Sequence, residues 1–207
     1  NPDGVLYGRL PGFGLTELGH AMAARAAEYL VDSGADIARV ISSPLLRAQL
    51  TAAPTAAAYD LSIQSDPRLI ESDNVFEGLP VNTNRAMLAN PKYYKYYCNP
   101  LRPSWGEPYR DIASRMSAAL SSALREARGR EALVVSHQNP IVTLTRFVNG
   151  QPLAHAPKSR HCALASITSF IFSGATLVGT SYAEPAADLV AMAKDMTPGD
   201  SQADLRR

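Results

Sequence analysis

The chain has 207 residues, of which 46% are apolar and 19% are charged, and its formal net charge is +1 at pH 7. These values are typical of a globular protein with one sizeable core or at most two small ones. A charge so close to zero excludes a bulk field that would attract nucleic acid or anionic lipid. No apolar stretch approaches the roughly 20 residues that cross a bilayer. From the charge and the missing apolar stretch together, we expect neither a nucleic-acid nor a membrane partner.

The first part of the chain alternates helical and extended patterns after a turn-rich start over residues 1–14. Thr16 is well placed to cap the first helix, and Pro54 is expected to kink the second helix or to end it early. The predicted elements are a helix over 17–31, a strand over 38–42, a helix over 44–59 and a short strand over 61–64.

Periodicity fails between residues 68 and 108, where five prolines interrupt the chain. We expect residues 79–108 to form a lid-like insertion, as irregular excursions of this length are usually functional. The lysine- and tyrosine-rich run over 92–97 would cover a substrate or contact a second copy in a homodimer. Stacking of these tyrosines on bases is disfavoured by the near-neutral charge.

Helix and strand alternate again in the second half. The expected elements are a helix over 107–128, a strand over 132–136, a helix over 140–148, a β-hairpin over 163–172 and 176–182, and a partly ordered tail over 185–207. The alternation predicts a single α/β domain over residues 1–207 with a mostly parallel central sheet.

The cysteines and histidines give no metal pattern. Cys98 and Cys162 are far apart in sequence, and His155 and His161 lie on a loop without metal-ligand spacing. No secretory signal is visible at the N-terminus. We therefore expect reduced thiols, a cytoplasmic location, and no metal or other cofactor.

The junction after residue 135 is the most informative feature of the chain. An apolar run ends in His137, and Asn139 and Pro140 supply helix-start signals at once. His137 is therefore expected at the carboxyl end of a buried strand, facing the N-terminus of a helix. In open α/β sheets ligands bind at the carboxyl ends of the strands, and a helix N-terminus favours an anion.

A second junction of the same design follows the strand over 38–42. Ser43 can cap the next helix, Pro44 fits its first position, and Arg47 falls at the end of its first turn. The guanidinium of Arg47 would add a forked, permanently charged donor to the same anion. Two such junctions together predict a phosphate site.

Five segments in order resemble the histidine phosphatase superfamily, also called phosphoglycerate mutase-like. They are residues 8–19 (GRLPGFGLTELG), 43–52 (SPLLRAQLTA), 69–78 (LIESDNVFEG), 106–115 (GEPYRDIASR, with Pro108 in place of the usual serine) and 134–137 (VVSH). The resemblance implies a three-layer α/β/α fold. It also implies phosphoryl transfer through a phosphohistidine, without a cofactor, on a small phosphomonoester.

The same resemblance assigns roles to individual residues. Arg47 corresponds to a phosphate ligand, His137 to the second phosphate-contacting histidine, and Glu71 to the carboxylic acid that protonates the leaving oxygen. Asn1 has the spacing of a further phosphate ligand in the mutase branch. The interval from Glu71 to Gly78 is one residue shorter than in the phosphatase branch of the family. Glu77 therefore remains the alternative acid.

The nucleophilic histidine of the family lies in an Arg-His-Gly motif on the first strand, and these 207 residues contain no such tripeptide. The family's spacing places it about a dozen residues before Asn1, so we expect an upstream segment to supply the strand. The other reading is a member that lacks the nucleophile. Gln138 and Asn139 also replace a small glycine-containing pair, which would narrow the pocket.

Three functions are compatible with this pattern. A phosphatase acting on a small phosphorylated metabolite is the preferred reading. A phosphoglycerate mutase is the second, although its substrate-clamping motif is not recognisable within residues 85–110. A non-catalytic protein that binds a phosphorylated ligand is the third.

Overall fold

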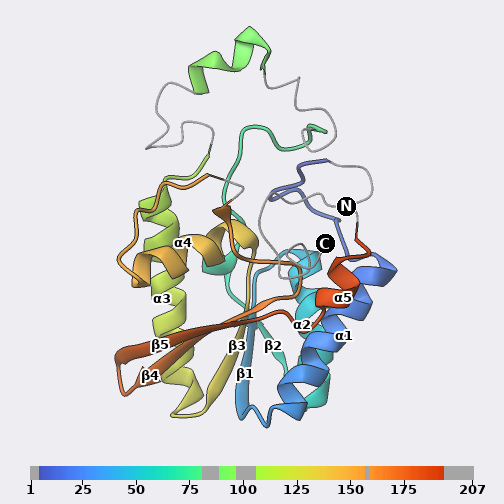
Figure 1. The fold of residues 1–207 in the computed structure, drawn as a ribbon, viewed down its shortest axis with the longest axis vertical. Helices are drawn as coiled ribbons and strands as arrows, with labels where there is room; N and C mark the ends of the chain where they lie inside the picture. Colours follow the sequence, from blue (N-terminus) through green and yellow to red (C-terminus); the bar gives the residue numbers. More distant parts are fainter. Residues whose placement is uncertain (1–4, 81–88, 97–105, 157–158, 194–207) are drawn as a thin grey trace.

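A parallel sheet lies at the centre of the molecule, in a computed structural model that describes residues 5–80, 89–96, 106–156 and 159–193 (Figure 1). Strand β1 (Ile37–Ser42) pairs in parallel with β2 (Ile63–Ser65) on one side and with β3 (Glu131–Val135) on the other. β1 is buried on both faces, which explains why its sequence is almost continuously apolar.

Helices cover both faces of this sheet. Helices α1 (Glu17–Asp32) and α2 (Leu46–Ala58) lie on one side, and α3 (Tyr109–Ala127) and α4 (Gln138–Val148) lie on the other (Figure 1). The prediction of an α/β protein with three layers is thereby confirmed.

Two apolar clusters hold the layers together, and β1 contributes to both. Ile41 belongs to the cluster with Ile112 and Met116 of α3. Val40 belongs to the cluster with Ala52 and Ala56 of α2. The core therefore fixes the two helices relative to the same strand, and with them the loops that follow its carboxyl end.

The predicted hairpin is present as β4 (Ile167–Ser173) and β5 (Thr176–Ala183), which pair antiparallel. Among the described residues these two strands form a sheet of their own, separate from the three parallel strands. β4 faces β3 across a cavity lined by residues of both strands.

Two helices begin at residues other than those predicted. α2 starts at Leu46 rather than at residue 44, and the Ser43 hydroxyl accepts a hydrogen bond from the Leu45 N–H at 3.4 Å. α4 starts at Gln138 rather than at residue 140, which makes His137 itself the N-cap residue. His137 is therefore closer to the helix N-terminus than the sequence indicated.

Pro54 does not end α2, so the prediction of an early end is wrong: the helix continues to Ala58. Burial of Ala52 and Ala56 against β1 compensates for the backbone hydrogen bond that a proline removes. Thr16 caps α1 as predicted, its hydroxyl accepting from the Gly19 N–H at 3.1 Å.

The insertion and the tail are described only in part. The described residues of the insertion include the 3-10 helix η3 (Pro91–Tyr96), where Tyr93 packs edge-on against Phe76 with ring centres 5.2 Å apart. Residues 81–88, 97–105 and 194–207 lie outside the described residues.

The short elements η1 (Pro67–Leu69) and α5 (Ala187–Val190) complete the fold. Within the described ranges, no helix is both long and apolar enough to cross a membrane.

Candidate active site

The two predicted junctions meet at the end of the sheet where the parallel strands β1 and β3 finish. β1 and β3 are parallel neighbours, so the residues that follow them emerge side by side, and the Ser43 N–H donates to the Val135 carbonyl at 2.9 Å. His137 Nε2 lies 2.8 Å from the Ser43 hydroxyl. The strand register thus brings together two segments that are more than ninety residues apart in sequence.

Arg47 points from the first turn of α2 toward the loop at residues 7–8. Its Nη2 donates to the Gly8 carbonyl at 2.7 Å, and its guanidinium lies over the Tyr7 ring at 4.8 Å from the ring centre. Burial lowers the pKa of Arg47, but a guanidinium stays charged in proteins. Its Nη1 is buried and has no hydrogen-bond partner within the described part of the chain. A buried cationic donor without a partner is suited to an anionic ligand.

His137 is held in the neutral form. It is only 7% exposed. Burial, followed by the positive charges of Arg47 and Arg115, lowers the pKa of His137 to about 3. At neutral pH its ring can therefore donate one hydrogen bond and accept another. A phosphate beside it would favour the protonated form and raise that pKa.

The pKa of Glu71 is shifted in the opposite direction to that of His137. Its Oε1 accepts hydrogen bonds from the Ser72 N–H at 2.8 Å and from the Ser72 hydroxyl at 3.2 Å. Burial nevertheless raises the pKa of Glu71 and outweighs these bonds and the charges of Arg47 and Arg160, which lower it. A carboxyl group with a raised pKa is suited to proton donation near neutral pH.

Glu77, the alternative acid, is engaged with the backbone instead. Its Oε1 accepts from the Arg9 N–H at 2.8 Å, and a Cβ at Gly8 would collide with the same carboxylate. Gly8 also has a φ of +38°, in the region that favours glycine. Glu71 lines the cavity together with Arg47 and His137, whereas the lining does not include Glu77.

Glu107 links the loops around the site. Its carboxylate accepts from Arg9 Nη2 at 2.8 Å, and Arg115 contacts both of its oxygens at 2.8 and 2.9 Å. Arg9 Nε in turn donates to the Glu71 carbonyl at 2.7 Å. This network joins the loop after residue 7, the loop of Glu71 and the N-terminus of α3.

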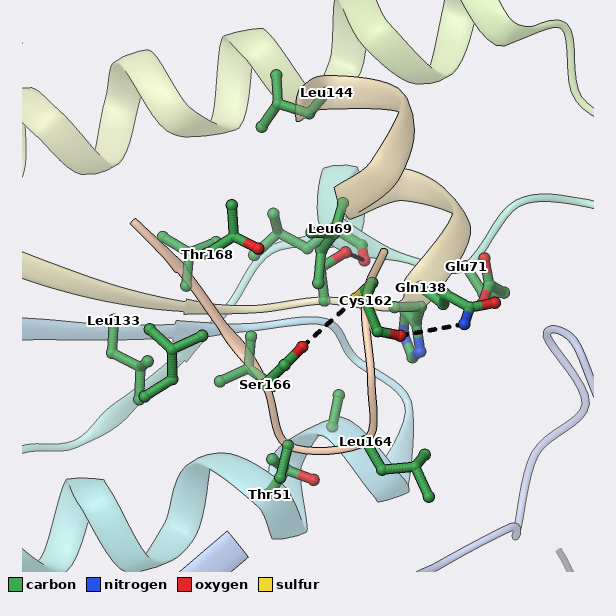
Figure 2. Close-up of a pocket in the computed structure, with 18 of the residues that line it drawn as sticks. Thr51, Leu69, Glu71, Leu133, Gln138, Leu144, Cys162, Leu164, Ser166 and Thr168 are labelled. Atoms are coloured by element: carbon green, nitrogen blue, oxygen red, sulfur yellow. Dashed lines mark hydrogen bonds between the residues drawn. The ribbon is translucent and has the colours of Figure 1, made fainter. Parts of the chain in front are cut away.

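The side chains of Gln138 and Asn139 anchor two further segments to the start of α4. Asn139 Nδ2 donates to the Ser72 hydroxyl at 2.8 Å, next to Glu71. Gln138 Nε2 donates to the Cys162 carbonyl at 3.1 Å (Figure 2). The pair that departs from the family pattern thus positions the acid and the loop before β4.

Arg47, Glu71 and His137 line one cavity of about 1990 Å³, together with Glu107, Gln138 and Asn139. Glu71, Gln138 and Cys162 lie at one end in Figure 2, whereas Leu133 and Thr168 lie at the other. The charged end is where β1 and β3 finish, and the apolar end extends between β3 and β4. No group of three or more histidine, cysteine or acidic residues that could hold a metal ion occurs in the described ranges.

The geometry brings together three of the four predicted site residues, namely Arg47, His137 and Glu71. Asn1 lies outside the described residues, and its role as a phosphate ligand stays a prediction. Sequence reasoning missed Tyr7 and Arg160, which line the same cavity. Both lie on irregular loops, where no periodicity indicates the direction of a side chain.

The comparisons with known proteins agree with the α/β fold described above. The sequence matches the histidine phosphatase superfamily (branch 1) over residues 1–184, and the chain belongs to this family.

Three similar proteins illustrate the range of the family. The chain is 50% identical over 187 residues to the uncharacterised protein Rv0525 of Mycobacterium tuberculosis, covering 90% of this chain and 92% of that protein. It is 33% identical over 160 residues to a probable phosphoglycerate mutase GpmB of Yersinia pestis, covering 74% and 72%. The structure is similar to that of the mycobacterial glucosyl-3-phosphoglycerate phosphatase Rv2419c, with 26% identity, a TM-score of 0.59, and coverage of 74% and 76%.

Proposed function

We propose that this protein is a phosphatase that hydrolyses a small phosphorylated metabolite through a phosphohistidine, without a cofactor. The observation that carries the proposal is the buried Nη1 of Arg47, which has no hydrogen-bond partner among the described residues. It lines the same cavity as His137 and a carboxyl group, Glu71, whose pKa is raised.

In the proposed reaction, Arg47 and His137 hold the equatorial oxygens of the phosphoryl group, whose transfer depends mainly on positioning and on positive charge. A histidine attacks phosphorus, the bond to the alcohol oxygen breaks, and Glu71 gives its proton to that oxygen. The Glu71 carboxylate then takes a proton from water as the water oxygen attacks phosphorus. Phosphate leaves, the nucleophilic histidine is restored, and Glu71 is again protonated.

We place the nucleophilic histidine on a strand upstream of Asn1. The apolar end of the cavity supports this placement, because it is a groove bounded by β3 and β4 and covered by residues of α1 and α3, including Met22 and Leu120. Within the described residues, β3 pairs with β1 and β4 pairs with β5, so their facing edges have backbone groups open to a further strand. A strand parallel to β3 in this groove would end beside His137.

The similar proteins include a phosphatase, which favours hydrolysis, and a probable mutase, which leaves phosphoryl transfer to a hydroxyl as the alternative. The name of the mycobacterial glucosyl-3-phosphoglycerate phosphatase supports cleavage of a phosphomonoester. The similarity to a probable phosphoglycerate mutase supports phosphoryl transfer to a second hydroxyl instead of to water.

Product analysis separates these functions. We would express the chain together with any codons that precede Asn1 and incubate it with 3-phosphoglycerate and with p-nitrophenyl phosphate. Release of inorganic phosphate supports the phosphatase, and 2-phosphoglycerate as the product indicates the mutase. Formation of neither product would count against both enzyme functions on these substrates and would favour the non-catalytic binder.

Arg47→Met provides the variant for this assay. It should lower kcat/KM by at least about a hundredfold, since it removes the guanidinium while keeping an apolar chain of similar length. Arg125→Met, at an exposed position of α3, is the matched control and should retain the activity.

A further inference from the structure

Arg47 is a partly buried cation that no carboxylate neutralises. Within the part of the chain that the structure describes, its guanidinium takes part in no ion pair. Arg9 and Arg115, by contrast, each pair with the Glu107 carboxylate at 2.8 Å. Because a charge removed from water needs compensation, another group has to stabilise the Arg47 guanidinium.

The Tyr7 ring provides this compensation. The guanidinium carbon of Arg47 lies over the ring at 4.8 Å from its centre, which is within the range of a cation–π interaction. The negative face of an aromatic ring attracts a cation although the ring carries no net charge. Arg47 is therefore stabilised while its positive charge is not cancelled. Tyr7 lies outside the five segments that resemble the family, so the resemblance assigns it no role.

The loop around Tyr7 fixes the ring in this position. Phe13 stacks on the Tyr7 ring, with the ring centres 4.6 Å apart and the ring planes at 25°. The neighbouring Leu6 exchanges backbone hydrogen bonds with a loop further along the chain. Its N–H donates to the Leu79 carbonyl at 2.9 Å, and its carbonyl accepts from the Gly78 N–H at 2.8 Å. These contacts fix the ring relative to two other parts of the site.

The same loop determines which guanidinium nitrogen a ligand can use. Arg47 Nη2 donates to the carbonyl of Gly8, the residue after Tyr7, at 2.7 Å. Nη1 is buried and has no hydrogen-bond partner within the described ranges. The ring and the carbonyl together restrict the guanidinium to one orientation, so its side-chain entropy is lost on folding and not on binding. This preorganisation favours an anion at Nη1.

We propose that Tyr7 is a positioning residue of the phosphate site, whose ring face holds the Arg47 guanidinium without neutralising it. The inference rests on the proposed function, in which Arg47 binds a phosphoryl oxygen. A carboxylate in place of the ring would also hold the guanidinium, but it would cancel the charge and repel a phosphate. An aliphatic side chain there would leave the charge intact but would not fix its orientation.

Binding of inorganic phosphate tests this without turnover. Calorimetry is carried out on the protein expressed with any codons that precede Asn1. Tyr7→Leu should weaken phosphate binding about tenfold, since it removes the cation–π contact. Tyr7→Phe keeps the ring face and should bind phosphate within about twofold of the wild-type protein. Tyr7→Glu should bind phosphate more weakly than Tyr7→Leu, which a merely structural role of the ring does not predict.

Tyr29→Leu is the matched control, because Tyr29 is an exposed tyrosine of α1, and it should retain the wild-type affinity for phosphate. Urea unfolding of Tyr7→Leu, Arg47→Met and the double variant measures the contact itself. The double variant should be less destabilised than the sum of the two single variants, since both substitutions remove the same interaction.

The outcomes distinguish a failure of this inference from a failure of the proposed function. The inference is overturned if Arg47→Met loses phosphate affinity while Tyr7→Leu or Tyr7→Glu binds phosphate as the wild-type protein does. A tenfold loss in Tyr7→Phe would also overturn it, because the hydroxyl and not the ring face would then be required. Unchanged phosphate affinity in Arg47→Met would instead contradict the proposed function, and additive stabilities would show that Tyr7 does not hold Arg47.

Discussion

At the scale of single residues, three ionisable side chains of one cavity differ in charge because their surroundings differ. Arg47 remains a cation, and its buried Nη1 has no hydrogen-bond partner in the part of the chain that the structure describes. His137, beside that cation and out of water, is neutral. The buried carboxyl of Glu71 has a raised pKa and can hold a proton closer to neutral pH. A cation, a neutral imidazole and a proton donor together suit a phosphomonoester.

The role of Glu71 as acid predicts a dependence on the leaving group. Glu71→Gln should lower kcat for an alkyl phosphate by at least about a hundredfold, since an alkoxide leaves poorly without a proton. The same variant should lower kcat for p-nitrophenyl phosphate by less than about tenfold. Steady-state kinetics with both substrates measures the difference.

Glu77→Gln is the matched control for this prediction. Its amide oxygen can still accept from the Arg9 N–H, so both substrates should be hydrolysed nearly as in the wild-type protein. An equal loss on alkyl and aryl substrates in Glu71→Gln would remove Glu71 from the role of acid. A selective loss in Glu77→Gln would transfer that role to Glu77.

His137 predicts a pH dependence of stability. Its pKa in the folded protein is about 3, against an ordinary value of 6.5 for a histidine. Between these values the unfolded chain binds a proton that the folded chain does not, so the free energy of unfolding falls as the pH drops below about 6.5. The contribution lost between pH 7 and pH 5 should be about 2 kcal/mol. Urea unfolding at both pH values measures it.

His137→Gln removes this contribution while keeping a side chain that can reach the Ser43 hydroxyl. The variant should lose less stability than the wild-type protein between pH 7 and pH 5. His20→Gln, at an exposed histidine of α1, should show the wild-type dependence. Equal pH dependence in His137→Gln and the wild-type protein would mean that His137 titrates normally.

At the scale of elements, the site depends on loops that are tied to helix ends. Glu107, just before α3, binds Arg9 and Arg115 with all three side chains largely removed from solvent. Arg9 then holds the Glu71 backbone. The start of α4 holds the same loop from the other side through Asn139. The helices thus fix the acid relative to the phosphate end of the cavity.

Glu107→Gln tests this network. The change leaves the guanidinium groups of Arg9 and Arg115 without their negative partner, which should lower the free energy of unfolding by about 2 kcal/mol. Urea unfolding measures the loss. Glu28→Gln removes a solvent-exposed pair with Arg25 and should cost less than about 0.5 kcal/mol. Equal effects of the two substitutions would contradict a structural role for Glu107.

The order and type of these elements could be predicted from the sequence, because apolar runs and helix caps are local signals. The starts of α2 and α4 could not, because Ser43 and His137 bond to one another across the sheet edge instead of capping alone. Pro54 does not end α2 early for a similar reason: the packing of its neighbours against β1 outweighs the local preference of proline.

At the scale of the whole molecule, the groove between β3 and β4 is the main feature that no local pattern predicts. It arises because two sheets, each short, face one another under α1 and α3. Arg47 and His137 could be predicted because their positions follow strand ends, and Glu71 could be predicted only from the family resemblance. Arg160 could not, because its position depends on the fold of the loop before β4.

The groove predicts a difference in hydrogen exchange. If an upstream strand fills it, backbone amides of β3 and β4 on the groove side should exchange more slowly in the chain expressed with the codons before Asn1 than in the 207-residue chain. Amides of β1 that bond to β2 provide the internal control, since both proteins contain that pairing. Equal exchange of the β3 and β4 amides in the two proteins would contradict the placement of the strand.

The most direct test of the central claim is a crystal structure of the protein with orthovanadate, which mimics the phosphoryl group. We predict vanadate oxygens within hydrogen-bond distance of Arg47 Nη1 and of the His137 ring, with Glu71 beside the apical oxygen. Vanadate bound elsewhere, or no vanadate in this cavity at a saturating concentration, would contradict the assignment of Arg47 and His137 as the phosphate site.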